Sequence, residues 1–79
     1  MDKSVHFLDM LHERAISEEW IDRALSQADL VEEHSDHTRR YLKQIPEYGD
    51  RWLRVVVNVT KTPNRCVTAF FDRRLRKKL

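Results

Sequence analysis

The spacing of apolar side chains changes once along this chain, close to residue 29. Before that point they recur every three or four residues, as on one face of a helix, and after it they alternate with polar residues, as on one face of a strand. A chain of 79 residues has room for one hydrophobic core. The change of period therefore predicts an α+β domain, with two N-terminal helices packed on one face of a three- to four-stranded antiparallel sheet.

The first part of the chain contains two helix signals in close succession. Residues 5–15 carry an apolar stripe at helical spacing, and Ser4 precedes them as a suitable N-cap. Ser17 is a second cap, and the two glutamates that follow it suit the positive end of a helix dipole. The second helix is predicted to run to about Gln27. Because the break between the helices is short, we expect them to pack as neighbours.

Four strands are predicted after the helices, at residues 30–34, 38–45, 52–60 and 65–71. On the third strand one set of alternate residues should lie under the helices, namely Leu53, Val55, Val57 and Val59. The other set should form a face accessible to a partner, namely Trp52, Arg54, Val56 and Asn58. We expect one domain over residues 1–72 and a basic tail over residues 73–79.

Charged residues are divided unevenly between the two halves. Residues 1–36 contain 3 Lys or Arg and 10 Asp or Glu, a net charge of −7, whereas residues 37–79 contain 12 and 3, a net charge of +9. The basic half predicts affinity for a polyanion or an acidic protein segment. Alternatively, the two halves neutralise each other across the fold.

Neither a run of apolar residues long enough to cross a bilayer nor the apolar stretch of a signal peptide is present, so no membrane partner is expected. Cys66 is the single cysteine, which excludes an internal disulfide and fits a reducing compartment. These features predict a cytoplasmic protein.

Short motifs along nearly the whole chain resemble one known family. Glu13–Ser17 reads Glu-Arg-Ala-Ile-Ser, Arg39–Tyr41 reads Arg-Arg-Tyr, Leu53–Val57 reads Leu-Arg-Val-Val-Val, and Val67–Phe70 reads Val-Thr-Ala-Phe before a basic tail. This series resembles a bacterial family of short domains of unknown function, with Ala15 where that family usually has glycine. The family in turn looks like a branch of the RelE/ParE and BrnT-like toxin superfamily.

The resemblance implies a fold of helices followed by a sheet, and a toxin held inactive by an antitoxin. Several members of that superfamily cut messenger RNA, and others poison a different target without nuclease chemistry, so fold alone leaves the activity open.

Cleavage of RNA by attack of a ribose 2′-OH needs a base, an acid, and cations on the phosphate. The residues that we expect to supply them are His6, Arg14, Arg40, Tyr41 and Arg54. The residues that we expect to bind nucleic acid are Arg39, Arg54, Arg73, Arg74, Arg76, Lys77 and Lys78. Structural alternatives stay open: His6 as a capping residue, Arg54 as an ion-pair partner, and Tyr41 as an aromatic at the edge of the core.

A metal site and a thiol nucleophile are the weaker signals. His34, Asp36 and His37 fall on a predicted turn, and a dedicated site usually needs three or four convergent ligands, so we interpret them as solvated residues. Cys66 lies in an apolar strand, where a free thiol behaves as a small hydrophobe. No metal or cofactor is therefore predicted.

Two functions remain open from the sequence. One is a toxin-like domain that binds RNA or the ribosome through a basic sheet face, acts in its catalytic version as a metal-independent endoribonuclease, and is neutralised by an acidic antitoxin. The other is a non-enzymatic protein-interaction module with the same fold.

Overall fold

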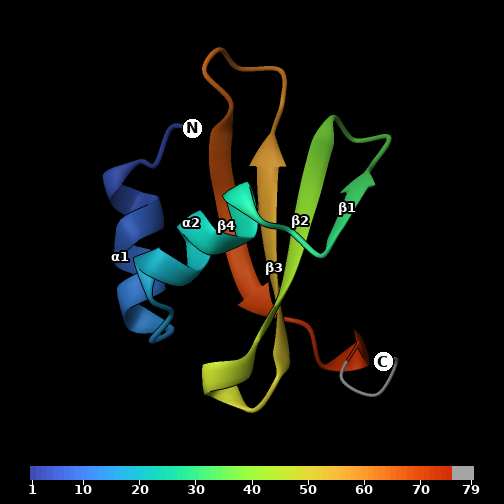
Figure 1. Ribbon diagram of the computed structural model, residues 1–79. Helices are drawn as coiled ribbons and strands as arrows, with labels where there is room; N and C mark the ends of the chain where they lie inside the picture. The colour runs from blue at the N-terminus through green and yellow to red at the C-terminus, as the bar shows by residue number, and fades with distance from the viewer. Residues whose placement is uncertain (76–79) are drawn as a thin grey trace.

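The computed structural model describes residues 1–75 and shows two helices followed by a four-stranded antiparallel sheet (Figure 1). The elements are α1 (Val5–Glu13), α2 (Glu18–Ser26), β1 (Leu30–Glu33), β2 (Thr38–Ile45), β3 (Arg51–Asn58) and β4 (Arg65–Phe71), with single 3-10 turns η1 (Pro46–Tyr48) and η2 (Arg73–Leu75). The predicted fold class is confirmed.

Both helices begin at the predicted serine caps. The side chains of Ser4 and Ser17 each accept a hydrogen bond from a backbone N–H two or three residues further on, at 3.1 and 3.2 Å. The first helix ends two residues earlier than predicted, because Arg14 leaves the helical conformation and Ala15 adopts a left-handed φ of 56°. Glycine is favoured at such a position after a helix, so alanine is strained there.

Neither of the two helices in residues 1–75 has the length and apolar content needed to cross a lipid bilayer.

The four strands are joined in chain order, so the sheet is a meander, β1-β2-β3-β4. The second and fourth strands have the predicted bounds, and the third ends two residues early, where the Asn58 side chain accepts the N–H of Thr60 at 2.9 Å. A one-residue bulge at Val67 interrupts the pairing of β3 with β4. Beyond β4, Asp2 bridges to Arg65 and ties the N-terminus to this edge of the sheet.

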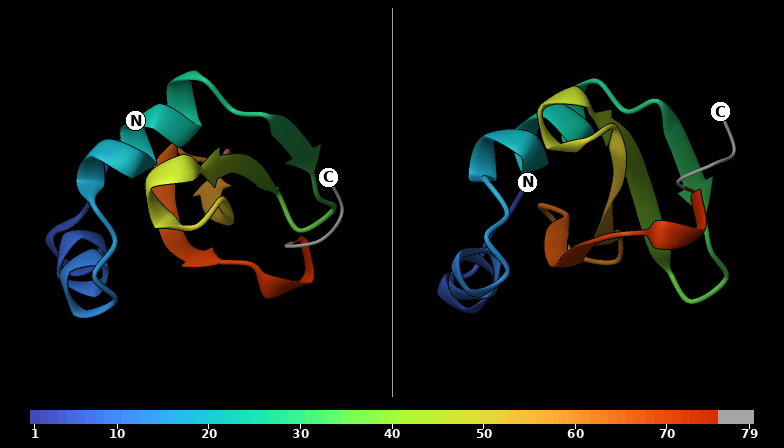
Figure 2. Two further views of the ribbon diagram at one scale, coloured as in Figure 1. Left: turned by 60° about the horizontal axis from the view of Figure 1, so that its bottom comes forward. Right: turned by 90° about the horizontal axis from the view of Figure 1, so that it is seen from below.

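The hydrophobic core lies between the helices and one face of the sheet. The two further views show both helices on that side of the sheet (Figure 2). The buried members of the core come from both helices, their connection and three strands: Phe7, Leu11, Ile16, Ile21, Ala24, Ile45, Leu53, Val55, Val57, Cys66 and Ala69. The predicted helix-facing set on β3 is confirmed, with Val59 packed at its margin.

The opposite side of the sheet, here called the far face, differs from the prediction. We expected its β3 residues to be accessible, but Trp52, Arg54 and Val56 are only 3–6% exposed. The chain after β4 folds back beside β3, where the N–H of Asp72 donates to the Trp52 carbonyl at 2.8 Å. The segment after β4 therefore packs against β3, and these three side chains are not accessible to a partner as we expected.

Candidate functional site

Part of the uneven charge of the two halves is neutralised by ion pairs between them. Five basic residues of the C-terminal half form ion pairs with carboxylates of the N-terminal half: Arg39 with Glu33, Arg40 with Asp36, Lys43 with Asp29, Arg54 with Glu32, and Arg65 with Asp2. Within residues 1–75, the Lys and Arg side chains without a carboxylate partner are Arg14, Arg51, Lys61 and Arg73. These are the described cations that can meet an external anion without first losing a carboxylate.

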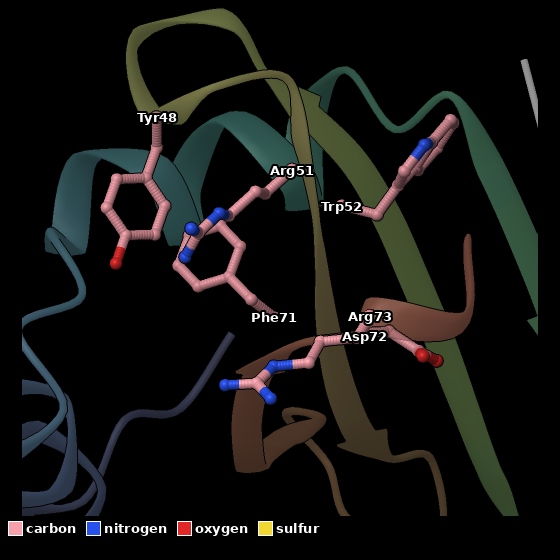
Figure 3. A pocket seen from close by; sticks show the side chains of 6 residues that line it. All are labelled: Tyr48, Arg51, Trp52, Phe71, Asp72 and Arg73. Carbon is pink, nitrogen blue, oxygen red and sulfur yellow. The ribbon is translucent and has the colours of Figure 1, made fainter. Parts of the chain in front are cut away.

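Two of these unpaired arginines line one pocket, here called the sheet-end pocket. It has a volume of about 200 Å³ and is bounded by Tyr48, Arg51, Trp52, Phe71, Asp72 and Arg73 (Figure 3). Arg51 opens β3, and Arg73 follows the end of β4. The antiparallel register places Leu53 opposite Phe71 and so brings these two strand ends together. The pocket therefore exists only because residues about twenty positions apart meet at one end of the sheet.

Aromatic rings form one wall of the sheet-end pocket. The ring centroids of Tyr48 and Phe71 lie 4.7 Å apart, and Trp20 of α2 packs against both, at 5.7 and 5.9 Å. The guanidinium carbon of Arg51 lies 4.7 Å from the centroid of the Tyr48 ring, within cation–π range. Tyr48 remains 43% exposed. A planar group can therefore stack here beside two free guanidinium groups.

Trp52 is a further lining residue of the same pocket. Its side chain is almost fully buried, and its indole N–H has no partner within the described part of the chain. Figure 3 shows Trp52 and Asp72 on one side of β3, with Tyr48 and Phe71 on the other. The Trp52 indole therefore lies across β3 from the aromatic wall of the pocket.

A buried ion-pair network lies next to the pocket, centred on Arg54. Its guanidinium donates to Asp72 at 3.0 Å and to Glu32 at 2.7 Å, and Arg74 donates to Asp72 at 2.9 Å. Hydrogen bonds from Arg74 and then from Arg54 hold the pKa of Asp72 well below its usual range. Arg54 is therefore an ion-pair partner, which was the structural alternative to a functional role. It is buried, however, and does not lie on an exposed face.

A second hollow, the far-face hollow, opens on the other side of Asp72. It has a volume of about 340 Å³ and is lined by Glu32, His34, Arg40, Arg54, Asp72, Arg74 and Leu75. His34 Nε2 lies 3.0 Å from Glu32 Oε1, and Arg40 Nε is buried without a partner among residues 1–75. Three arginines, one histidine and two carboxylates thus surround this space.

The five residues that we expected to be catalytic do not meet at one place. His6 is exposed on α1, and Arg14 at the end of that helix donates to the Ala69 carbonyl at 2.8 Å. Tyr41 lies at the margin of the core on the helix side of β2, whereas Arg40 and Arg54 lie on the far face. The set is divided among a helix surface and both faces of the sheet.

The residues predicted to bind nucleic acid are also dispersed. Arg39 pairs with Glu33 and donates to the Tyr41 hydroxyl at 3.4 Å, on the helix side of the sheet. Arg73 and Arg74 lie in η2, the first at the sheet-end pocket and the second at the far-face hollow. The predicted contacts of Arg76, Lys77 and Lys78 lie outside the described residues. Only Arg73 of this set is both described and unpaired.

We did not predict Tyr48, Arg51 or Phe71 as site residues, and we interpreted His34 as a solvated residue. The one local signal was the aromatic and basic pair that flanks the single glycine, Tyr48-Gly49-Asp50-Arg51. Gly49 and Asp50 both have left-handed φ values, 66° and 57°, and the tight connection they form places Tyr48 and Arg51 side by side. No local sequence pattern places Phe71 and Arg73 at this pocket, because only strand pairing brings them next to Tyr48 and Arg51.

The weaker candidates have structural explanations. No three His, Cys, Asp or Glu side chains of residues 1–75 converge in a way that could hold a metal ion. Cys66 is buried, and desolvation raises the pKa of its thiol, which disfavours the reactive thiolate.

Comparison with known proteins gives a family and nothing more specific. The family model described as Domain of unknown function (DUF4258) matches residues 4–71. The curated proteins contain no match, and neither do the solved structures.

Proposed function

Because the chain belongs to the DUF4258 family, a family of unknown function, we infer its activity from its own surface. We propose that it is a toxin-like domain that binds single-stranded RNA in the sheet-end pocket. One observation carries this proposal. Arg51 and Arg73, two of the few described cations without a carboxylate partner, line the same pocket as the exposed aromatic wall, and Arg51 lies over its Tyr48 ring.

The two components of the pocket match the two components of a nucleotide. Guanidinium groups donate to phosphate oxygens, and aromatic rings stack on any base, so the combination recognises a single strand with little sequence preference. In duplex RNA the bases are already stacked and their faces are hidden, so Tyr48 would find no partner there.

The toxin part of the proposal is supported by the sequence motifs described above and by the order of helices and sheet. The motifs resemble the family of unknown function, which in turn looks like a branch of the RelE/ParE and BrnT-like superfamily, whose members share the order of helices and sheet and include toxins held inactive by a partner. An antitoxin that neutralises this chain would cover Arg51 and Arg73 with carboxylates. RNA and antitoxin would then compete for one pocket.

A non-enzymatic interaction module is the second candidate, and the same arginines favour it. An acidic protein segment with an aromatic or apolar side chain would fit the pocket as well as a nucleotide does. The two functions differ in one respect: RNA binding by the isolated chain is expected only under the first.

The proposal is tested by measuring the affinity of the purified chain for a fluorescent single-stranded RNA at low salt. Replacing Arg51 or Arg73 by alanine should weaken binding at least about tenfold, since a charged hydrogen bond is worth about 1.5–3 kcal/mol. Tyr48→Ala should weaken it by a similar factor through lost stacking. Lys61→Ala is the matched control, because it removes one unpaired charge from the exposed loop between β3 and β4, at the other end of the sheet (Figure 1).

The outcomes separate the two candidates. Equal affinity of the native chain and the Arg51 and Arg73 variants would refute the sheet-end pocket as the RNA site. No RNA binding by the native chain, together with normal growth of a bacterial host after its induction, would favour the interaction module.

A further inference from the structure

The lining of the far-face hollow carries more positive than negative charge. Three arginines and two carboxylates line it, which gives a net charge of +1 when the histidine beside them is neutral. Arg54 is fully engaged there, because it donates to Glu32 at 2.7 Å and to Asp72 at 3.0 Å. The two arginines left to meet an external anion are Arg40 of β2 and Arg74 of η2.

These two arginines keep unused hydrogen-bond donors. A guanidinium group has five N–H donors. Within residues 1–75 the side chain of Arg40 makes one hydrogen bond, a long one of 3.4 Å to Asp36, and Asp36 is not part of the lining. Arg74 donates to Asp72 through Nε and one terminal nitrogen, and its side chain is 80% exposed. A terminal nitrogen of each guanidinium is therefore available to an oxyanion in the hollow.

The hollow also contains a histidine with an unpaired acceptor. Nε2 of His34 lies 3.0 Å from Oε1 of Glu32. Hydrogen bonds from His34 and Arg54 lower the pKa of Glu32, so this group is an ionised acceptor at neutral pH and the proton of a neutral imidazole lies on Nε2. Nδ1 then has a lone pair for which residues 1–75 supply no donor.

The ion that suits this combination has several acceptor oxygens and keeps one proton. Hydrogenphosphate is such an ion, because three of its oxygens accept hydrogen bonds and the fourth carries a hydroxyl that donates. Sulfate has the same tetrahedral shape but no proton at neutral pH, so one of its oxygens would face the His34 lone pair without a hydrogen bond. The volume of about 340 Å³ is many times that needed for one water molecule and admits a tetrahedral oxyanion.

We propose that the far-face hollow is a binding site for inorganic phosphate, in which Arg40 and Arg74 donate to its oxygens and Nδ1 of His34 accepts from its hydroxyl. The site does not depend on the proposed function, since the unpaired arginines of the sheet-end pocket do not line it. Because Arg40 and Arg74 come from β2 and η2, a bound phosphate joins the chain after β4 to the sheet and stabilises the folded state.

An NMR titration of the full chain labelled with ¹⁵N tests the site at pH 8 and constant ionic strength, with sodium phosphate and sodium sulfate as the added ions. We expect phosphate to bind at least about tenfold more tightly than sulfate, the factor expected from one buried acceptor left unpaired. Methyl phosphate has lost its second proton at this pH and should bind as weakly as sulfate.

Two variants locate the ion. Arg40→Gln and Arg74→Gln should each weaken phosphate binding about tenfold, through the loss of one charged hydrogen bond. Lys61→Gln is the matched control, because it removes the same charge from an exposed residue that does not line the hollow. It should change the affinity by less than about twofold. A thermal melt of each variant shows that the fold is retained.

The role of His34 has a pH readout. The charged groups around it come from every neighbouring element: Glu32, Asp36, Arg40, Arg54, Asp72 and Arg74. Hydrogen bonds, chiefly from His34, Thr38 and Arg74 respectively, lower the pKa values of the three carboxylates, so these stay ionised between pH 8 and pH 5.5.

Histidine gains a proton over this range, and Nδ1 then becomes a donor. Sulfate should therefore bind more tightly at pH 5.5 than at pH 8. His34→Gln should abolish this rise, whereas His37→Gln should keep it, since His37 is exposed and lines neither space.

Four results would overturn the inference. No change in the spectrum on adding phosphate would refute the site outright. Equal affinity for phosphate and sulfate at pH 8 would contradict the contact with His34. Native affinity in Arg40→Gln and Arg74→Gln would exclude the hollow, and loss of phosphate binding in Arg51→Ala alone would place the ion in the sheet-end pocket. Binding of RNA is measured separately, and its failure would leave this site standing.

Discussion

At the scale of single residues, burial decides what each arginine does. Arg54 is 5% exposed and meets two carboxylates, whereas Arg51 and Arg73 meet none within the described residues. A paired and buried guanidinium supports the fold, because its charge is satisfied only in the folded state. An unpaired guanidinium beside an exposed ring can accept an external anion.

We predict that Arg54→Ala destabilises the domain by about 3 kcal/mol or more, the usual effect of breaking a buried ion pair. Glu32 and Asp72 would lose their common partner, and a cavity would form on the far face. Urea unfolding measures the change. Arg39→Ala removes a more exposed ion pair and should have a much smaller effect.

Equal stability of the Arg54 and Arg39 variants would show that the far-face network does not hold the sheet together. The prediction also bears on assays of toxicity. Because Arg54→Ala weakens the fold, relief of growth arrest by that variant would not identify Arg54 as functional, whereas relief by Arg51→Ala would be informative.

At the scale of elements, carboxylates form hydrogen bonds between segments that lie apart in the sequence. Glu47 in η1 accepts two hydrogen bonds from Arg23 of α2, at 2.9 and 2.7 Å. Glu32 joins β1 to β3, and Asp72 joins the end of β4 to β3 and η2. The meander and the helix layer are thus tied together by ionised carboxylates at the margins of the core.

We predict that the free energy of unfolding decreases in acid, because these carboxylates become protonated. The hydrogen bonds from Arg23 lower the pKa of Glu47 to about 2, and the pKa values of Glu32 and Asp72 are also lowered by their arginine partners and, at Glu32, by His34. A carboxyl group whose pKa is lower in the folded state binds protons more readily when unfolded. Its stabilising contribution is therefore complete above a pH of about 4 to 5 and is lost as the pH falls towards 2.

Urea unfolding at pH 6 and at pH 3 tests this expectation. The free energy of unfolding should be smaller at pH 3, and Glu47→Gln should reduce the difference between the two values. Glu13→Gln should leave the difference unchanged, since Glu13 forms no ion pair within residues 1–75. An equal response of both variants would contradict the role given to Glu47.

At the scale of the whole molecule, part of the charge division between the halves is taken up by ion pairs within the fold. Five of the basic residues beyond residue 36 are paired with carboxylates of the N-terminal half. The net charge of the basic half therefore overstates the number of cations that can bind RNA. The number of free cations, rather than the net charge, should set the salt dependence of binding.

We predict a shallow salt dependence. Two phosphate contacts, by Arg51 and Arg73, give a slope of about −1.4 in a plot of log affinity against log salt, or about a sevenfold loss between 50 and 200 mM salt. Three further contacts from Arg76, Lys77 and Lys78 would raise the slope to about −3.5 and the loss to about 130-fold. Fluorescence titration at several salt concentrations distinguishes the two.

Replacing the three tail cations by glutamine shows their share directly. An unchanged slope assigns the electrostatic contacts to the sheet-end pocket. A slope steeper than five contacts allow would contradict the internal pairing of the basic half.

The sequence predicted the elements well because their signals are local. Ser4 and Ser17 cap helices whose apolar stripes are regular, and the alternation of Leu53, Val55 and Val57 identified the face under the helices. β1 ends one residue earlier and β3 begins one residue earlier than predicted. The larger differences lie at the ends of α1 and β3, where Ala15 and Asn58 end an element through local geometry. Such endings depend on one residue and leave little trace in a periodic pattern.

The candidate site was not predictable in the same way. Strand pairing brings Phe71 and Arg73 to Tyr48 and Arg51, and the return of the chain after β4 places Asp72 between Arg54 and Arg74. Sequence spacing carries no information on these contacts, since each joins positions about twenty residues apart or depends on the direction of a turn.

The sequence by itself determined the order of the elements and the face of the sheet that the helices cover, because hydrophobic periodicity acts over a few residues. Only the tertiary structure decided which charges are free. Which cations are free depends on strand register. The register sets Arg39, Arg40 and Arg54 beside carboxylates of a neighbouring strand or turn. It leaves Arg51 and Arg73 at the end of the sheet without a carboxylate partner. Ion pairing acts across space, and the fold alone fixes those distances.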